Sequence, residues 1–192
     1  MTTDENAKAM NADNASNSNK ASAKVSPMRQ VKVAKITLNC GAGKNEALLE
    51  KGVKLLTKLS SVKPMKTKTT KRIPGWGLRP NLAIGCKATI RHGAKELLLK
   101  LLKARGDKLQ SKQFDAQGNF SFGIAEYIDI PGLEYDPDLK IMGLEVAVSL
   151  ERPGYRIKRR KVRSQKVGKA HVVSKEDAIA FAQNELGITI EG

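Results

Sequence analysis

The stretch MGLEVAVSL, residues 142–150, alternates apolar and polar side chains with a period of two. An extended chain places alternate side chains on opposite faces, so this stretch predicts a strand with one apolar face. That face would carry Leu144, Val146, Val148 and Leu150. The turn residues Pro153-Gly154 are expected to end the strand.

A second strand followed by a helix is predicted in KVAKITLNCGAGKNEALLEKGVKLLTKLS, residues 32–60. The alternation of the strand slips once, around Ala34-Lys35. The strand is expected to end at Gly41-Ala42-Gly43, a turn or bulge where glycine tolerates positive φ. Apolar residues at helical spacing then predict an amphipathic helix over roughly 46–60, and Pro64 prevents its continuation.

The remaining chain predicts short elements joined by turns. Strands are expected over 66–69, 87–91, 120–126 and 188–190, and helices over 94–102 and after the capping residues 174–177. The Gly/Pro-rich loop 71–85 is expected to be irregular. Short strands with tight turns favour an α+β fold, a mainly antiparallel sheet with helices packed on one face. The other face would be free to meet a ligand.

The expected organisation is one domain with a tail. Residues 1–26 have almost no large apolar side chain, so we expect them to be disordered. The domain would span 27–192 and include a basic extension at about 156–171. No apolar run approaches the roughly 20 residues that cross a bilayer, and the N-terminus lacks the apolar core of a signal peptide. A cytoplasmic location with no membrane partner is expected.

Charge is sorted into blocks along the 192 residues, whose net charge is +16. Residues 25–112 carry 21 Lys/Arg against 4 acids, and 152–171 carry 9 Lys/Arg and no acid. Between them, 114–151 carries 8 acids and one base. The basic blocks suggest a polyanionic partner. RNA would repel the acidic block, which we expect to lie away from it and to face a basic protein neighbour or to serve solubility.

No pattern of an enzyme or a metal site is found. Cys40 and Cys86 are expected to be buried reduced thiols rather than a disulfide, and no CxxC motif is present. The loop Gly41-Ala42-Gly43-Lys44 matches no nucleotide-binding motif, although its backbone N–H groups could meet an RNA phosphate. Asp136-Pro137-Asp138 favours a turn over a metal site. No cofactor is expected, and no catalytic residue is assigned.

Two segments suggest RNA contacts. If the strands at 66–71 and 87–91 are neighbours, one face would carry threonine hydroxyls among Lys and Arg, which suit RNA 2′-hydroxyl and phosphate groups. A merely solvated basic face is the alternative, and charge alone does not decide between them. In the loop, Trp76 lies between Arg72 and Arg79. Trp76 either reaches outward or is buried beneath its own loop.

Several segments together resemble one family over nearly the whole ordered chain. They are PMR (27–29), KITLNCGAG (35–43), KPMKTKTTK (63–71), IGCKATIRHG (84–93), NFSFGIAEY (119–127) and EYDPDLKIMGLEVAVSLERPGYRI (134–157). The chain resembles large-subunit ribosomal protein number five, the 5S rRNA-binding ribosomal protein. Its Glu-Tyr-Asp-Pro and Arg-Pro-Gly-Tyr segments are similar to the archaeal and eukaryotic branch.

The resemblance implies a non-enzymatic structural role in the large ribosomal subunit, with large-subunit rRNA and neighbouring ribosomal proteins as partners. It implies that the protein anchors 5S rRNA in the central protuberance. A small-subunit head protein would be contacted in an intersubunit bridge, and a long loop would reach P-site tRNA. The alternatives are a general basic nucleic-acid-binding or RNA chaperone protein, and a nucleotide-dependent enzyme built on the loop 41–43.

The predicted site residues form three sets. By position in the family, Lys35, Asn39 and Thr89 are implied to hydrogen-bond 5S rRNA. The full 5S rRNA set is Lys35, Asn39, Gly41, Gly43, Lys66, Thr67, Lys68, Thr69, Lys87, Thr89 and Arg91. The tRNA-facing set is Lys71, Arg72, Trp76 and Arg79. The rRNA-binding extension set is Arg156, Lys158, Arg159, Arg160, Lys161 and Arg163.

Overall fold

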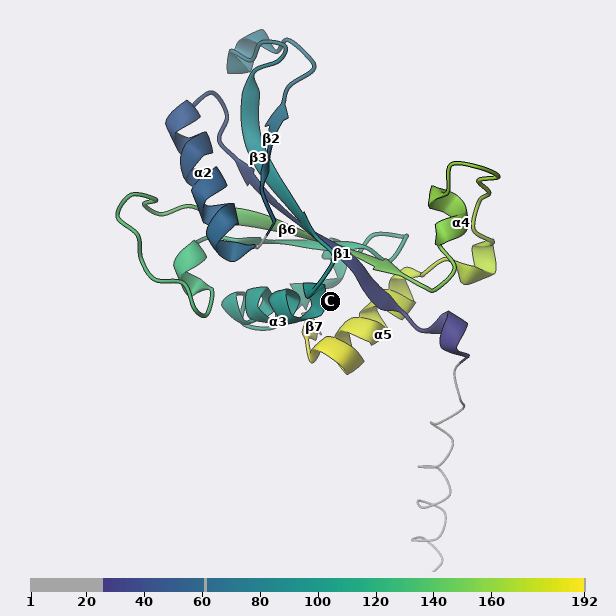
Figure 1. Cartoon of the computed structure of the whole chain (residues 1–192). Coiled ribbons are helices and arrows are strands. Elements are labelled where there is room, and N and C mark those ends of the chain that lie inside the picture. The colour runs from purple at the N-terminus through teal and green to yellow at the C-terminus, as the bar shows by residue number, and fades with distance from the viewer. Residues whose placement is uncertain (1–25, 61, 192) are drawn as a thin grey trace, which may run out of the picture.

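The computed structural model describes residues 26–60 and 62–191. Its main sheet has five strands in the order β2-β3-β1-β6-β5 (Figure 1), and each neighbouring pair is antiparallel. These strands are β1 (Lys32–Gly41), β2 (Met65–Lys68), β3 (Ala83–Ile90), β5 (Phe120–Ile124) and β6 (Leu144–Glu151). The helices are α2 (Glu46–Leu59), α3 (Ala94–Ala104), α4 (Arg156–Arg159) and α5 (Lys175–Leu186). The predicted α+β fold is confirmed, whereas the tail predicted over 1–26 lies, except for Ser26, outside the described residues.

Strand β1 occupies the centre of the sheet, between β3 and β6. Ile36, Leu38 and Cys40 are buried, and the residues that alternate with them are half-buried. The pairing of β1 with β6 shifts between Val33 and Lys35. This irregularity is the slip that the sequence predicts, and it restores the alternation so that the apolar residues on both sides of it reach the core.

Helix α2 is bounded by hydrogen bonds from its own neighbours. The side chain of Asn45 accepts from the backbone N–H groups of Ala47 and Leu48, at 3.1 and 3.4 Å. These bonds satisfy donors that the first turn of a helix leaves free. At the other end, the hydroxyl of Ser60 donates to the carbonyl of Leu56 at 2.7 Å. The predicted helix is confirmed with nearly the predicted bounds.

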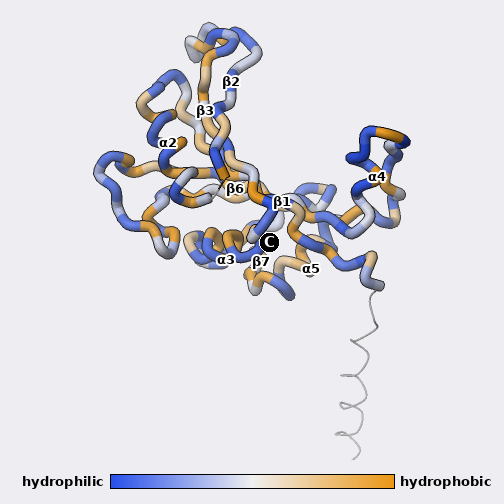
Figure 2. The backbone as a smooth tube through the Cα atoms, viewed as in Figure 1, coloured by the Kyte–Doolittle hydropathy of each residue, from blue (hydrophilic) through white to orange (hydrophobic). Residues whose placement is uncertain are grey.

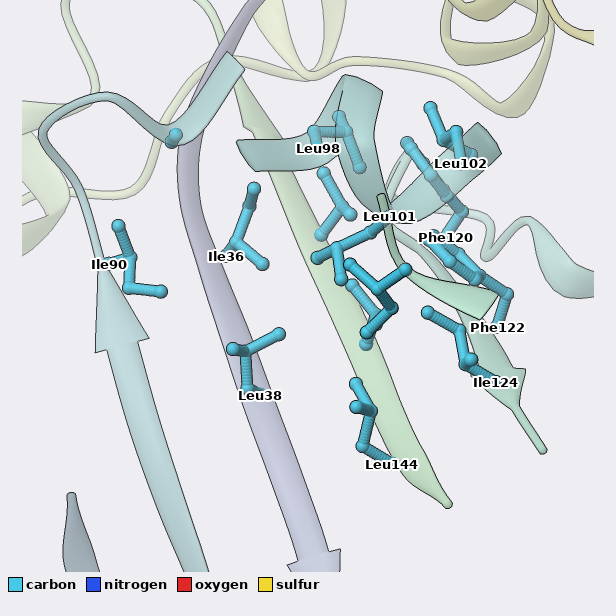
Figure 3. Close-up of a cluster of buried hydrophobic side chains, with 14 of the residues drawn as sticks. Ile36, Leu38, Ile90, Leu98, Leu101, Leu102, Phe120, Phe122, Ile124 and Leu144 are labelled. Carbon is cyan, nitrogen blue, oxygen red and sulfur yellow. The ribbon is translucent and has the colours of Figure 1, made fainter. Parts of the chain in front are cut away.

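The core lies between the sheet and the helices. Leu98, Leu101 and Leu102 of α3 are fully buried, and Figure 3 shows Leu98 toward Ile36 of β1 and Leu102 toward Phe120 of β5. Figure 2 shows α3 as mostly hydrophobic, in contrast to the hydrophilic chain around α4. Helix α2 buries its own leucines in the same cluster. We call this side of the sheet the covered face.

The two cysteines face each other on the covered face. Cys40 in β1 is paired directly with Cys86 in β3, and both are free and buried. A Cβ added to Gly52 of α2 would lie 3.0 Å from the Cys86 sulfur, so glycine lets the helix approach the two thiols closely. The hydrogen bond with Cys86 and burial raise the pKa of Cys40. The predicted buried thiols are confirmed, and Cys40 stays protonated at neutral pH.

A second, two-stranded sheet joins distant parts of the chain. Strand β4 (Lys108–Gln110) pairs in parallel with β7 (Thr189–Glu191). The final strand is predicted from the sequence, but β4 is not, because three residues are too short for a recognisable period. Helix α5, which leads to β7, begins at a capping box in which Ser174 and Asp177 bond each other's backbone N–H groups.

Candidate nucleic-acid interface

The side of the sheet opposite the core is polar, and we call it the open face. Its central rows follow from the strand register, in which Thr37 lies opposite Thr89, and Asn39 lies between Lys87 and Glu145. The residues of the open face are Lys35, Thr37, Asn39, Gly41, Met65, Thr67, Gly85, Lys87, Thr89, Ser121, Gly123, Glu145, Ala147 and Ser149. Lysines, hydroxyl-bearing residues and small residues therefore share a surface on the side of the sheet opposite the core helices.

Most of the strand residues predicted to bind 5S rRNA meet on the open face. Lys35, Asn39, Lys87 and Thr89 lie on two adjacent central strands. Thr67 joins them from β2, where it pairs with Gly85. The prediction that these two distant strands are neighbours is confirmed, because β2 and β3 pair in the sheet.

Three predicted residues of the second strand do not point to the open face. Lys66 pairs with Cys86, so its side chain lies on the side of the covered face, as does Lys68 at the end of β2. Thr69 is buried, and its hydroxyl donates to the carbonyl of Lys71 at 2.8 Å. The expectation of a single Lys/Thr face is therefore wrong for these positions. Arg91 is exposed and follows the end of β3 by one residue.

The glycine loop after β1 is not arranged to hold a phosphate. The backbone N–H groups of Ala42 and Gly43 both donate to the carbonyl of Ile84, at 2.9 and 3.0 Å. The first turn of α2 is capped by Asn45. The prediction that these N–H groups bind an RNA phosphate is wrong for Ala42 and Gly43, because both already donate to a carbonyl inside the fold.

The loop between β2 and β3 is shorter and more ordered than predicted. Strand β3 begins at Ala83, earlier than the expected Lys87, and the tip forms a short 3-10 turn over Pro74–Trp76. Trp76 is 69% exposed, which decides between its two predicted placements in favour of outward reach. Lys71, Arg72 and Arg79 are exposed on the same hairpin, which projects away from the rest of the chain (Figure 1).

The basic extension leaves the fold and returns to it at nearly the same place. Nε2 of His171 hydrogen-bonds the carbonyl of Pro153 at 2.8 Å. The backbone N–H of Val173 donates to the Tyr155 hydroxyl at 3.1 Å. Because both ends are tied to each other, the extension is a closed excursion held at its base, and it contains α4, which the sequence does not predict.

The predicted cations of the extension face solvent. The exposed set is Arg156, Lys158, Arg159, Arg160, Lys161 and Arg163. Arg159 forms an ion pair with Glu151 at the end of β6. The Arg160 side chain donates to the carbonyl of Arg163 at 2.7 Å. The extension thus presents a dense positive surface beside the sheet.

A hollow of about 640 Å³ connects the extension with the open face. Lys35 and Ser149 line it from the sheet, and Tyr155, Lys158 and Lys166 line it from the extension. This volume lies within the range of small-ligand sites, roughly 300–1,000 Å³. Lys35 of the sheet and the basic side chains of the extension therefore border the same hollow, which also contains Glu151.

The base of the extension is also fastened to α5. Arg152, whose side chain is only 10% exposed, donates from Nη2 to Oδ2 of Asp177 at 2.7 Å. Partial burial raises the pKa of Asp177, but hydrogen bonds from Ser174 and the charge of Arg152 outweigh it, so this pKa lies below its usual value. Asp177 therefore stays ionised at neutral pH and keeps both its cap and its ion pair.

The acidic side chains of residues 114–151 do not lie together, and Glu151 at the end of β6 pairs with Arg159 of the extension. Asp136 forms an ion pair with Lys58 of α2, and the hydrogen bond from Lys58 lowers the pKa of Asp136. Its other oxygen accepts from the backbone N–H of Asp138 at 3.0 Å, which is the turn that the sequence favours. Glu145 instead lies on the open face, where it accepts from the Asn39 amide at 3.0 Å. The expectation that the acidic block avoids the predicted RNA face is wrong for Glu145.

Several residues of the open face are missed by the sequence analysis. Thr37, Ser121 and Ser149 bring hydroxyls to it from three strands, and Arg105 reaches its edge by donating to the carbonyl of Gly123 at 3.1 Å. The alternation of each strand contains the signal for the hydroxyls, because every second residue between buried ones must face outward. The position of Arg105 depends on how α3 packs beneath β5, and no local pattern reveals it.

Over residues 26–60 and 62–191, no three His, Cys, Asp or Glu side chains are grouped so that they could hold a metal ion. Within the same described residues, none of the helices is both long and apolar enough to cross a membrane.

The chain is similar to one family of proteins along most of its length. Residues 26–79 match the family described as "Ribosomal protein L5", and residues 83–181 match the model of the C-terminus of the same ribosomal family. A protein of Nanoarchaeum equitans named "Large ribosomal subunit protein uL5" is 47% identical, over 85% of this chain and 98% of its own length. Proteins of the same name from Sulfurisphaera tokodaii and Nitrosopumilus maritimus are 42% and 39% identical, over 86% of this chain and 95% and 96% of their own lengths.

Proposed function

Because this chain belongs to the ribosomal protein L5 family, we propose that it binds 5S rRNA through the open face of its sheet and anchors it in the central protuberance. The family makes it a structural, non-enzymatic protein of the large ribosomal subunit in the cytoplasm, with rRNA and ribosomal proteins as partners. The proposal of 5S rRNA binding goes beyond family membership, and it is supported by the arrangement of residues on the open face.

The chemistry of the open face supports RNA rather than a solvated surface. On the paired strands β1 and β3, it offers hydroxyls from Thr37 and Thr89, an amide from Asn39 and a cation from Lys87. Hydroxyl and amide groups can both donate to and accept from a ribose 2′-hydroxyl. Rigid strands hold these groups at fixed spacing, which favours a defined RNA shape over general attraction.

The basic extension adds the electrostatic part of the proposed contact. Its exposed Lys and Arg side chains suit phosphates, which position a protein on RNA without reading sequence. The hollow lined by Lys35 and Lys158 joins the extension to the open face. One RNA could therefore run across both, or the extension could hold adjacent large-subunit rRNA while the open face holds 5S rRNA.

The projecting β2–β3 hairpin is proposed to contact P-site tRNA. Exposed Trp76 offers a stacking surface, and Arg72 and Arg79 flank it with positive charge. Subunits that carry Trp76→Ala should bind 5S rRNA normally but give weaker protection of P-site tRNA in chemical footprinting. An unchanged tRNA footprint would remove the hairpin from this role.

The loop between β5 and β6 is proposed to meet a basic small-subunit head protein in an intersubunit bridge. Glu134 and Asp138 are exposed there, beside Tyr135, which is 58% exposed, and Ile141, which is 66% exposed. Complementary charge would steer this contact. Glu134→Gln with Asp138→Asn should weaken subunit joining most at low salt, and equal joining at all salt concentrations would contradict the bridge.

Asp136 is unsuitable for that test, because it pairs with Lys58 inside the chain.

A competition experiment tests 5S rRNA binding against the alternative of a general basic RNA-binding or chaperone protein. The purified protein is titrated with labelled 5S rRNA at physiological salt, with and without excess tRNA and random duplex RNA. Binding that survives the competitors supports the proposal. Equal binding to all three RNAs favours the alternative, because nonspecific binding needs only charge.

A double variant then locates the contact. Asn39→Ala with Thr89→Val should weaken 5S rRNA binding by about 1–3 kcal/mol for each lost hydrogen bond, because RNA groups are left unpaired. Retained selectivity in a variant whose circular dichroism and unfolding are unchanged would exclude these two residues from the site.

A further inference from the structure

A second hollow, of about 500 Å³, lies at the end of the open face away from the basic extension. It is lined by Asn39 and Gly41 of β1, Gly123 of β5, Glu145 of β6, and by Arg105 and Gly143 nearby. We call it the glycine-lined hollow. Ile124, Ala125 and Leu144 complete its lining, and its three glycines leave part of the wall without side chains.

Neither steric contacts nor backbone conformation requires glycine at two of these positions. A Cβ added to Gly41 or Gly123 would meet nothing within 4 Å, and neither residue has positive φ. Gly143 is different, because a Cβ there would lie 2.8 Å from the carbonyl oxygen of Ala125. Glycine weakens a strand, and a strand glycine without a bulge or a packing requirement marks a place where another molecule approaches closely.

Glu145 shows what kind of molecule would approach. Its carboxylate is exposed and can only accept hydrogen bonds. Phosphate groups also only accept, so a phosphate placed here would be repelled. The hydrogen-bond donors of RNA are the base N–H groups and the 2′-hydroxyls, and a hollow whose wall includes three glycines leaves room for a base.

The partner of Glu145 narrows the choice further. Nδ2 of Asn39 donates to Oε2 of Glu145 at 3.0 Å, so Oδ1 of Asn39 remains an acceptor beside a carboxylate. The wall of the hollow therefore presents adjacent acceptors. Among the RNA bases, guanine alone carries two adjacent N–H donors, N1–H and N2–H2, on its Watson–Crick edge.

We propose that the glycine-lined hollow holds one unpaired guanine of 5S rRNA, with Glu145 and Asn39 accepting from N1–H and N2–H2 of the base. The proposal rests on 5S rRNA binding by the open face and adds a base-reading pocket to it. Gly41 and Gly123 leave the space that the ring occupies. Arg105, held by its bond to the Gly123 carbonyl, lies at the edge, where it would meet a flanking phosphate.

Base reading in a loop is the usual way in which proteins recognise RNA sequence, because bases in a helix have their edges occupied. The open face lacks aromatic residues, so stacking on a side chain cannot supply the specificity. A carboxylate that accepts from a base amino group is a known form of direct readout. Glu145 would weaken the attraction of this face for phosphates, but in the proposed pocket it recognises the N–H groups of guanine.

The experiment compares the full-length protein with Glu145→Gln and Gly123→Ala, using the source organism's 5S rRNA and kethoxal. Kethoxal reacts with N1 and N2 of unpaired guanine, the edge that the pocket is proposed to cover. Glu50→Gln is the matched charge control, because Glu50 is exposed on α2, away from the open face. Unfolding is measured for each variant.

The wild-type protein and Glu50→Gln should protect at least one guanine that reacts in free 5S rRNA. Glu145→Gln should leave that guanine reactive and weaken binding about tenfold or more, because the single amide oxygen would accept from Asn39, as Oε2 does now, and the amide N–H groups would face the donors of the base. Gly123→Ala should weaken binding similarly while unfolding at an equal or higher denaturant concentration, because alanine suits a strand better than glycine.

If Glu145→Gln binds 5S rRNA as tightly as the wild type or more tightly, with a steeper salt dependence, the proposed guanine pocket is wrong, because Glu145 then merely repels RNA. Protection of the same guanine by wild type and Glu145→Gln would overturn it too. If the wild type itself loses 5S rRNA to tRNA competitors, the proposed function fails, and that result is seen before any variant is tested. Replacing the protected guanine with inosine, which lacks N2, should lower the affinity for wild type but not for Glu145→Gln.

Discussion

The covered and open faces of the sheet are made from alternate residues of the same strands, yet their chemistry differs completely. In β1, Ile36 and Leu38 are fully buried beneath the helices, whereas Thr37 between them and Asn39 after them face outward. The glycines of the open face also differ from one another. Gly85 is required by the fold, since a Cβ there would lie 2.8 Å from the Cys40 carbonyl oxygen, whereas Gly123 is not.

This difference teaches that stability and the proposed RNA recognition are encoded at separate positions one residue apart. A strand alternates with a period of two, so each face can change without moving the other. Substitutions in adjacent residues should therefore have effects on different measurements. Two variants test that separation, and two others test the extension and its base, which belong to neither face.

Leu38→Ala should have the largest effect, and it should appear in stability. Leu38 is 0% exposed, so its truncation leaves a cavity and should lower the free energy of unfolding by about 2–5 kcal/mol in urea titrations. The remaining folded protein should keep its preference for 5S rRNA over tRNA. Loss of that preference would show that the two faces are coupled.

Asp177→Asn examines a region on neither face, the base of the extension. It should lower the free energy of unfolding by about 1–2 kcal/mol at neutral pH, because it weakens the cap of α5 and the bond to Arg152. Since the pKa of Asp177 is lowered on folding, this stabilisation is present above the ordinary Asp value and is lost as pH falls through the lowered one.

The two proteins should therefore converge in urea titrations carried out at progressively more acidic pH. A stability difference that stays constant into strongly acidic solution would assign the effect to packing rather than to the charge of Asp177.

Thr37→Val should leave stability nearly unchanged, because the side chain keeps its shape on an open strand surface. It should weaken 5S rRNA binding about fivefold, corresponding to roughly 1 kcal/mol for a lost hydrogen bond. The affinity is measured by filter binding and compared with that of Leu38→Ala, because the two residues are adjacent in the chain but lie on opposite faces. Unchanged affinity would limit the contact to the other residues of the open face.

Lys158→Gln with Lys161→Gln should have the smallest effect at physiological salt. The slope of log affinity against log salt should fall in magnitude by roughly 1–2, because two phosphate contacts are lost. At high salt the variant and the wild type should bind equally. A slope that does not change would show that these lysines do not meet RNA.

Much of the fold follows from periodicity in the sequence. The alternation at Leu144–Leu150 and the helical spacing over 46–60 predict β6 and α2, and even the irregularity at Lys35 is visible. Short elements such as β4 and α4 escape, because a few residues contain no period. They form only because β7 supplies a partner to one and tied ends enclose the other.

The site was less predictable than the fold, because the facing of a side chain depends on register. Lys66 and Thr67 are equally plausible RNA ligands in sequence, but pairing with Cys86 and Gly85 sends them to opposite sides. The expectation that the acids lie away from the predicted RNA face failed at Glu145 for a related reason. Block charge describes a segment, whereas a strand inside that segment still presents single residues to whichever face its register dictates.

The pairing of β1 with β6 also determines when the open face exists. Asn39 and Glu145 are bonded across the sheet although they lie 106 residues apart in the chain. During synthesis, which adds about 5–20 residues per second, β1 and β3 are made long before β6 emerges to complete the central rows. Nascent copies therefore lack the finished surface for most of their synthesis, and if this surface binds RNA as proposed, unfinished chains would not compete with completed protein for it.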